Sequence, residues 1–148
     1  MISPEVLRRY PFFTTASDET LKLLAMGGET RTYEAGQYLF HDGDAADHLL
    51  VLTEGEVDIQ YVLQDGEHRT VDTRVAGDIV LWSAVVVPFK TTANGVARRR
   101  TRVVALDALK LRELCETDHE LGYHLMREIA QVMSHRLQGA RVQLATVG

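Results

Sequence analysis

The sequence predicts a mainly β protein, a jelly roll (double-stranded β-helix) of about eight short strands with flanking helices. Between residues 30 and 106, short runs of β-forming residues alternate with glycines roughly every ten residues, which is typical of a sandwich or barrel. Outside this region, helix caps and helically spaced apolar residues occur instead. The 148 residues are the length of one domain. We expect a single domain over residues 1–148, with helices over 1–28, the β-roll over 30–106 and helices over 107–145.

Each predicted strand is a short run of β-formers that ends at a turn signal. The turn glycines are Gly36, Gly43, Gly55, Gly66, Gly77 and Gly95. The predicted strands are Thr30–Tyr33, Tyr38–Phe40, Leu49–Thr53, Glu56–Val62, Thr70–Val75, Ile79–Leu81, Thr91–Ala97 and Arg102–Leu106.

Two short helices are predicted before the roll. One covers Glu5–Tyr10. The other begins after Ser17, whose hydroxyl can cap it while the acidic residues of its first turn complement the helix dipole. Gly27-Gly28 is expected to end this helix.

Two further helices are predicted after the roll. Asp107 is the expected N-cap of a helix over Ala108–Cys115. The sequence Thr117-Asp118-His119-Glu120 has the Thr-x-x-Glu spacing of a capping box, which predicts a long helix to about Leu144.

The long helix carries two apolar faces. The first consists of Leu121, Leu125, Ile129 and Val132 and is expected to pack on the protein's own β-roll. The second stays apolar towards the C-terminus and is expected to meet a second copy, which predicts a two-fold homodimer. The expected dimer residues are Met126, Ile129, Met133, Leu137, Ala140 and Leu144. The alternative is one wide face buried within a single chain.

Composition argues against several classes of protein. Sixteen Lys and Arg against 21 Asp and Glu give a net charge of −5, so no nucleic-acid partner is expected. The longest apolar stretch, Ile79–Phe89, is far shorter than the roughly 20 residues that span a bilayer, so no membrane partner is expected. Cys115 is the one cysteine, which argues against a disulfide framework and is compatible with a reducing compartment. We expect a cytoplasmic protein.

Four stretches of the sequence resemble the cyclic-nucleotide-binding domain of bacterial catabolite-activator-type regulators. They are Leu7–Phe13, Tyr33–Asp47, Val51–Val57 and Gly77-Asp78, within the family's order of helix, eight-stranded roll, short helix and long helix. The tail Leu137–Leu144 is also similar to that family's dimerising helix. The resemblance covers nearly the whole chain and implies the family's fold and a ligand-sensing role.

The phosphate-binding cassette of that family follows the stretch that matches Gly77-Asp78. The resemblance puts Leu81 where a glycine is expected and Trp82 where a glutamate is expected, with Ser83 next. No carboxylate then remains to accept the ribose hydroxyl proton. Lys90 stands at or near the position of the family's arginine, so a point charge replaces a guanidinium fork. We therefore expect weak or no binding of ordinary cAMP and cGMP.

The candidate ligand-binding residues are Leu81, Trp82, Ser83, Lys90, Thr91, Thr92 and Arg136. Several have a second interpretation. Trp82 could fill the nucleotide cleft or pack in the core, and Lys90 could be a solvated loop residue. Thr91 and Thr92 could simply be β-formers that start a strand. Arg136 interrupts an apolar arc of the long helix, and either reaches into the pocket or is exposed beyond the edge of the roll.

The chain offers no candidate for DNA binding. Transcription factors of the family carry a helix-turn-helix after the dimerising helix, whereas this sequence ends at Gly148. The basic cluster Arg98-Arg99-Arg100 with Arg102 lies between two predicted strands and is interpreted as a solvated hairpin loop.

The sequence shows no candidate catalytic machinery. A metal-dependent cupin would need several histidines and a glutamate at one end of the barrel, but the six histidines include no His-x-His pair. We expect no metal site and no required cofactor. The expected ligand is a cyclic nucleotide or another small anionic or aromatic molecule.

The leading hypothesis is a non-enzymatic ligand-sensing and regulatory protein. A ligand near Trp82 and Lys90 would shift the long helix and so change the dimer seam. The second hypothesis is a docking module in which Trp82 has closed the pocket and the roll binds an enzyme partner. A plain cAMP receptor and a cupin-type metalloenzyme are the remaining alternatives.

Overall fold

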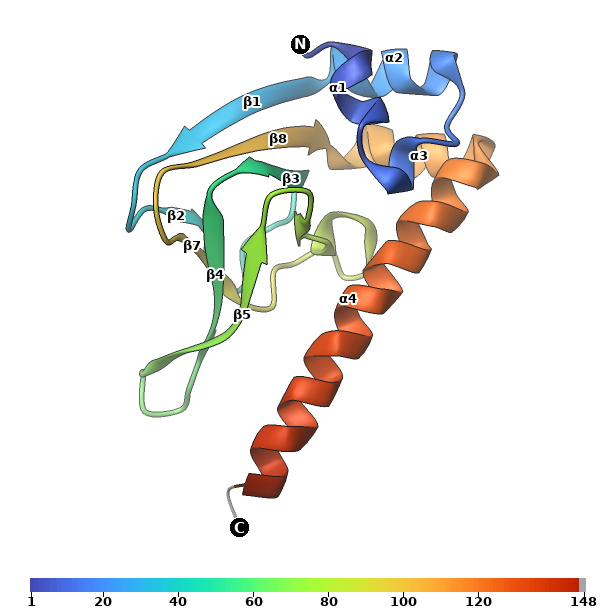
Figure 1. Ribbon diagram of the computed structural model, residues 1–148. Helices are drawn as coiled ribbons and strands as arrows, with labels where there is room; N and C mark the ends of the chain where they lie inside the picture. Colours follow the sequence, from blue (N-terminus) through green and yellow to red (C-terminus); the bar gives the residue numbers. More distant parts are fainter. Residues whose placement is uncertain (147–148) are drawn as a thin grey trace.

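The computed structural model describes residues 1–146, except for the side chains of residues 143, 144 and 146. In this part of the chain, eight strands form two four-stranded antiparallel sheets. Figure 1 shows the roll with the N-terminal helices and α3 (Ala108–Thr117) gathered at one end. The long helix α4 (His119–Thr146) runs along its side towards the hairpin of β4 (Glu56–Val62) and β5 (His68–Val75). The predicted fold class, a mainly β roll with flanking helices, is confirmed.

The two sheets have strand orders β1-β8-β3-β6 and β2-β7-β4-β5. In the first sheet, β1 pairs with β8 from Gly28↔Leu106 to Tyr33↔Thr101. The first-sheet strands are β1 (Gly28–Tyr33), β3 (His48–Glu54), β6 (Ile79–Leu81) and β8 (Thr101–Asp107). The second-sheet strands are β2 (Tyr38–Phe40), β4 (Glu56–Val62), β5 (His68–Val75) and β7 (Asn94–Ala97). All eight predicted strands therefore occur, but β7 starts at Asn94, three residues later than expected.

The helices also follow the predicted order. They are α1 (Pro4–Arg8), α2 (Asp18–Met26), α3 (Ala108–Thr117) and α4 (His119–Thr146), with short 3₁₀ turns η1 (Pro11–Phe13) and η2 (Ser83–Val85). The first predicted helix, Glu5–Tyr10, ends early, because Tyr10 is extended before Pro11 and η1 begins there.

Two of the three expected caps are confirmed. The Ser17 hydroxyl accepts a hydrogen bond from the Thr20 amide at 3.1 Å. Asp107 Oδ2 accepts from the Lys110 amide at 2.8 Å. The capping box on Thr117 is wrong by one residue, because Asp118 Oδ1 accepts from the Leu121 amide at 3.1 Å. Its other oxygen accepts from the Ser17 amide, so Asp118 also ties α4 to the start of α2.

The first apolar face of α4 is buried as expected. Leu121, Leu125, Ile129 and Val132 are at most 5% exposed. Leu121, Leu125 and Ile129 belong to the same hydrophobic cluster as the buried residues of the roll. The helix as a whole also contacts η1 and α3 and, to a smaller extent, β5, so the roll is one of several partners of α4. The N-terminal segment, which was expected only as two short helices before the roll, contacts α4 through η1 (Pro11–Phe13).

The second face of α4 is exposed in the single chain. Leu137 is 62% exposed, and Met126, Met133 and Ala140 are exposed as well. Ile129 was expected in the dimer seam, but it is 2% exposed and belongs to the chain's own core, so that assignment is wrong. The Leu144 side chain lies outside the described residues.

We predict that Gly55→Ala destabilises the protein much more than Gly36→Ala. Both glycines have positive φ, at +98° and +88°, so both alanines incur backbone strain. A Cβ on Gly55 would also lie 2.5 Å from the Arg100 carbonyl oxygen and 2.7 Å from Thr101 Cα, whereas a Cβ on Gly36 meets open space. Urea unfolding should show a further loss of about 2 kcal/mol or more for Gly55→Ala. Equal losses would contradict this packing.

Candidate functional site

The segment that follows β6 crosses from one sheet to the other. Before β6, the turn at Gly77 is held by the Asp78 carboxylate, which accepts a hydrogen bond from the Val75 amide at 2.9 Å. β6 belongs to the first sheet and β7 to the second, so residues 82–93 bridge the two. We call residues 82–93 the cassette loop, because this is the stretch in which a phosphate-binding cassette was expected.

The start of the cassette loop is folded into the protein. Leu81 and Ser83 are buried, and Trp82 is half-buried and packs against the hydrophobic core. Trp82 precedes η2 and lines both a small cavity inside the roll and a larger groove outside it. This agrees with the interpretation of Trp82 as a cleft-filling, core-packed residue.

The cavity inside the roll is nearly filled. It has a volume of about 10 Å³. A cavity of this size is about the smallest that holds one water molecule, whereas small-molecule sites take about 300–1,000 Å³. The cavity therefore has no room for a nucleotide. Its walls are Phe40, Ile59, Val80, Leu81, Trp82, Ser83, Thr92, Ala93 and Arg136.

Phe40 accounts for much of this filling. A Cβ built on Gly95 would lie 2.5 Å from Cε1 and Cζ of the Phe40 ring, so the ring lies directly against the backbone of β7. Phe40 itself is 8% exposed. The absence of a side chain at Gly95 is what lets the ring enter the space between the sheets.

The second half of the cassette loop does not present the expected polar groups to a ligand. Lys90 is exposed, its backbone bridges to Ala45, and it lines neither the cavity nor the groove. The buried Thr91 hydroxyl donates to the His41 carbonyl and accepts from the Asp44 amide, so it is used in a turn. Thr91 is therefore not the start of a strand. Thr92 is exposed and lines both the inner cavity and the groove.

Arg112 fastens the cassette loop to α3. Its Nη1 donates to the Ala84 carbonyl oxygen at 2.7 Å. Its Cζ lies 4.0 Å from the centroid of the Phe89 ring, at the other end of the loop. Since α3 packs against both η2 and α4, Arg112 is part of the connection between the cassette loop and the long helix.

Arg136 on α4 is buried against β5. Its side chain is 10% exposed, and Nε lies 3.7 Å from Asp72 Oδ2. Burial is the main influence on the pKa of Arg136 and lowers it, while the negative charge of Asp72 acts in the opposite direction. The interpretation of Arg136 as an exposed residue beyond the roll is therefore wrong.

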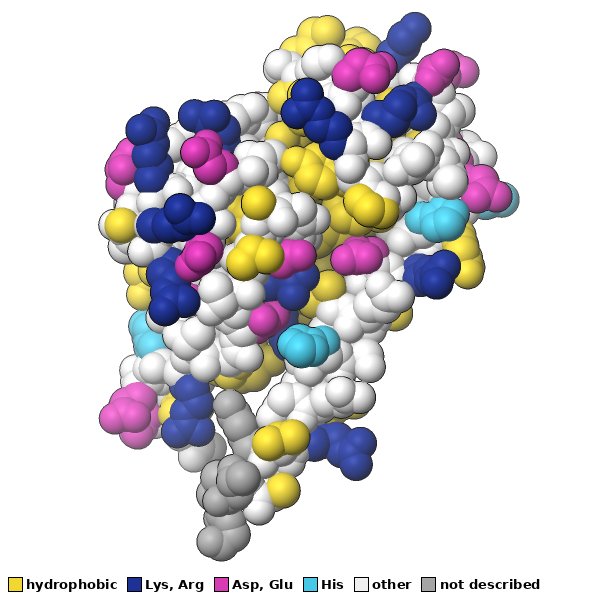
Figure 2. Space-filling model, viewed as in Figure 1, with side chains coloured by type: hydrophobic (Ala, Val, Ile, Leu, Met, Phe, Trp, Pro, Cys, Tyr) yellow, Lys and Arg dark blue, Asp and Glu magenta, His cyan; other side chains and the backbone are white. Residues whose placement is uncertain are grey.

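A groove lies between the mouth of the roll and α4. Its volume is about 650 Å³, within the range of small-molecule sites of about 300–1,000 Å³. Figure 2 shows acidic and basic side chains between the sheet and α4 in this view. The lining residues are Tyr61, Trp82, Thr92, Ala130, Met133, Ser134, Arg136, Leu137 and Ala140.

The comparisons with known proteins agree with this geometry. The family profile described as "Cyclic nucleotide-binding domain" matches residues 30–118, more than half of the chain. The chain belongs to the cyclic nucleotide-binding domain family. It therefore has the fold of a regulatory, ligand-sensing domain.

Solved structures of this family superpose over most of the chain. A protein of Geobacter metallireducens GS-15 named for cyclic nucleotide binding is 36% identical, with a TM-score of 0.79 over 93% of this chain and 99% of that one. The N-terminal domain of a Streptomyces coelicolor A3(2) transcriptional regulator is 28% identical, with a TM-score of 0.66 over 88% and 93%.

The catabolite activator protein of Thermus thermophilus is similar in fold, with 21% identity and a TM-score of 0.70 over 93% of this chain and 62% of that one. Among curated proteins, none matches the sequence.

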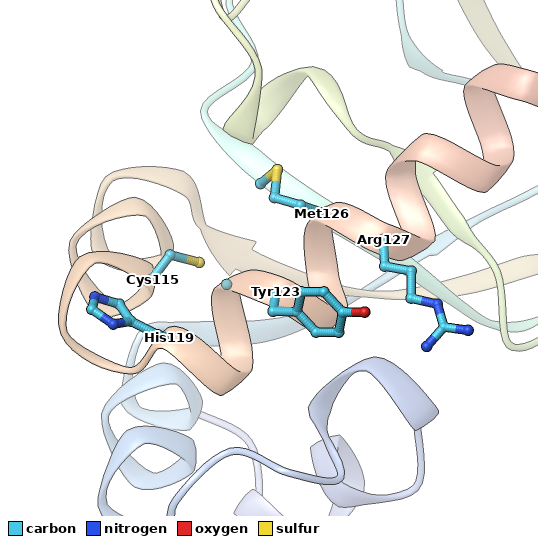
Figure 3. A pocket seen from close by; sticks show the side chains of 6 residues that line it. Cys115, His119, Tyr123, Met126 and Arg127 are labelled. Carbon is cyan, nitrogen blue, oxygen red and sulfur yellow. The ribbon is translucent and has the colours of Figure 1, made fainter.

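A second pocket on the surface lies where α3 is followed by α4. Its volume is about 600 Å³, and Cys115, His119, Tyr123, Met126 and Arg127 line it together with Gly122. Figure 3 shows these side chains spread along the outside of the two helices rather than converging on one point. Burial raises the pKa of the Cys115 thiol to about 11, so the thiol stays protonated and unreactive at neutral pH.

The described residues contain no group of three or more His, Cys, Asp or Glu side chains placed to hold a metal ion. None of the helices described has the length and apolar composition needed to cross a membrane.

Sequence reasoning missed three residues of the site. Phe40 and Tyr61 were read only as members of strands, and Asp72 as part of another strand. A signal existed for Asp72, because two acidic or basic residues at alternate positions of one strand, Asp72 and Arg74, face the same side. Nothing in the sequence connected them to Arg136, which is 64 and 62 positions away.

We predict that Arg112→Lys loosens the cassette loop. The lysine keeps the charge but loses the planar group that reaches the Ala84 carbonyl and stacks on Phe89, so stability should fall by about 1–2 kcal/mol in urea unfolding. The native emission of Trp82, the one tryptophan, should shift to longer wavelength. Arg127→Lys, at an exposed position of α4, serves as the control and should stay within about 0.5 kcal/mol. Identical behaviour of the two variants would refute the anchoring role.

Proposed function

We propose that this chain is a non-enzymatic ligand sensor whose pocket binds ordinary cAMP and cGMP weakly or not at all. The supporting observation is the inner cavity of about 10 Å³ with Trp82 in its wall, at the position where the family resemblance expects a glutamate. A cyclic nucleotide could enter only if Phe40 and Trp82 moved out of the core. The protein works in the cytoplasm under this proposal.

Besides the lack of space, the cassette loop lacks two of the groups that are expected to recognise a cyclic nucleotide. A hydrogen bond to a charged group contributes about 1.5–3 kcal/mol. The ribose carboxylate and the phosphate-binding guanidinium are both missing from the cassette loop, and Lys90 points its charge to solvent. Two such losses weaken a micromolar ligand about a hundredfold or more.

The mechanism we propose transmits ligand binding from Trp82 to α4. Trp82 lines the groove together with Met133 and Leu137, so a molecule bound there contacts the roll and the long helix at once. Arg112 offers a second connection, from the cassette loop through α3. A ligand that favours one position of α4 shifts the population towards it.

We also propose that α4 pairs with a second copy of the chain. Met126, Met133 and Leu137 are large apolar side chains at helical spacing, and all three are exposed in the single chain. Leaving them in water is unfavourable, and an isologous helix pair would bury them on both copies. A ligand in the groove and a partner on the seam then share the same helix face.

A docking module is the second candidate function. The filled cavity favours it as well, because a roll with no internal space needs no ligand to be stable. In this case the roll binds an enzyme partner and α4 does not respond to small molecules.

We predict that calorimetric titration with cAMP or cGMP shows no saturable binding below about 100 μM. The double variant Leu81→Gly/Trp82→Glu restores the family's glycine and carboxylate and removes the indole from the cavity wall. It should bind cAMP at least about tenfold more tightly than the parent protein, provided that circular dichroism shows an unchanged fold. Low-micromolar binding of cAMP to the parent protein would overturn the proposal.

We predict that the protein sediments at twice its chain mass of 16.6 kDa and that Leu137→Asp sediments as a monomer. The charge would be buried without a partner in the helix pair. Gln138→Asp introduces the same charge at the neighbouring exposed position, which lies roughly 100° around the helix and off the seam. It should remain a dimer. A monomeric parent protein would end the dimer proposal.

A further inference from the structure

The groove between the roll and α4 has one buried cation in a mainly apolar wall. Trp82 and Tyr61 form its side on the roll, and Met133, Leu137 and Ala140 form its side on α4. Arg136 is the one charged residue in the lining. A site of this composition selects ligands with an apolar body and a single anionic group.

The hydrogen-bonding capacity of Arg136 is not used by the protein. Its Nε and Nη2 atoms are shielded from solvent, and neither has a hydrogen-bond partner among the described residues. The side chain as a whole is nine-tenths buried, and the nearest carboxylate oxygen, Asp72 Oδ2, is 3.7 Å from Nε, too far for a hydrogen bond. Buried donors without partners are costly, so a group that supplies acceptors here gains more than it would on the surface.

Asp72 does not satisfy Arg136 because another arginine holds it. Arg74 Nη1 donates to Asp72 Oδ2 at 3.2 Å. Arg74 Nε lies 3.6 Å from Asp78 Oδ2, which itself accepts from the Val75 amide. The two carboxylates are therefore arranged around Arg74, and Arg136 has a charged neighbour without a hydrogen bond.

We propose that the groove binds a small molecule that carries one carboxylate or sulfonate on a flat apolar body. The Arg136 side chain turns towards the groove when the ligand binds, because its Nε and Nη2 atoms are otherwise shielded, and its guanidinium then donates hydrogen bonds to the anionic group. The apolar body lies between Trp82 and the apolar side chains of α4. A planar carboxylate matches the two parallel donors of a guanidinium fork. A dianion fits less well, because Asp72 already balances part of the positive charge. This inference names the ligand class of the proposed sensor and rests on that proposed function.

The test compares an acid with its neutral analogue on the unmodified protein. In calorimetry, 1-naphthaleneacetate should bind saturably with one site per chain. 1-Naphthaleneacetamide, which has the same ring system without the charge, should bind at least about tenfold more weakly, as expected for a hydrogen bond to a charged group. Equal affinities, or no saturable binding of the acid, would overturn the inference.

Substitutions of Arg136 then test whether this residue holds the anionic group of the ligand. Arg136→Gln should weaken binding of the acid at least about tenfold and leave binding of the amide unchanged. Arg136→Lys keeps the charge without the fork and should give an intermediate loss. Arg141→Gln, at an exposed position of the same helix, should change neither affinity. If Arg141→Gln weakened the acid as much as Arg136→Gln did, the anion would be held by general surface charge and the assignment to Arg136 would be wrong.

The same titrations distinguish a wrong ligand class from a wrong proposed function. Low-micromolar binding of cAMP would overturn the proposal that nucleotides bind weakly, whatever naphthaleneacetate does. Failure of the acid to bind, with cAMP also silent, would overturn the ligand class alone and favour the docking module.

Discussion

The ring of Phe40 lies against the backbone of Gly95, and this contact closes the interior of the β-roll. Trp82 also lines the cavity next to Phe40, and this cavity has a volume of about 10 Å³. A fold that is built to enclose a ligand here encloses its own side chains instead. The stability of the roll then depends on this packing rather than on an occupant, and under the proposed function a ligand is recognised in the groove beside the roll.

Because the interior of the roll is nearly filled, the polar groups that could bind a ligand lie at the contact between β5 and α4. Arg74, Asp72 and Arg136 form a buried charged group there, and among the described residues Nε of Arg74 and both Nε and Nη2 of Arg136 have no hydrogen-bond partner. Burying such a group without full hydrogen bonding is unfavourable for the isolated chain. Under the proposed function, the placement of Arg136 between the roll and the exposed face of α4 would connect ligand recognition to self-association through a single helix. Two events that use the same helix face are thermodynamically linked, so each changes the affinity of the other.

Sequence reasoning predicted the candidate site unevenly. Trp82 could be placed in the wall of the cavity because it lies only a few positions after Gly77-Asp78. The position of a residue so close to a recognisable turn follows from the sequence. Lys90 could not be placed, because its orientation depends on a loop conformation and on the bridge to Ala45. Thr91 was read as a strand residue, since nothing local shows that its hydroxyl bonds to His41 and Asp44 about fifty positions earlier.

The sequence by itself determined the order and type of the elements, because caps, turn glycines and residue periodicity act over a few positions. Ser17, Asp107 and the glycine turns placed most boundaries within one or two residues of those observed. Only the tertiary structure decided which neighbours α4 meets: η1 packs against α4, Asp72 attracts Arg136, and Phe40 fills part of the roll. These contacts join residues that are far apart in the chain, and their free energy comes from burial and charge in three dimensions, which no local pattern encodes.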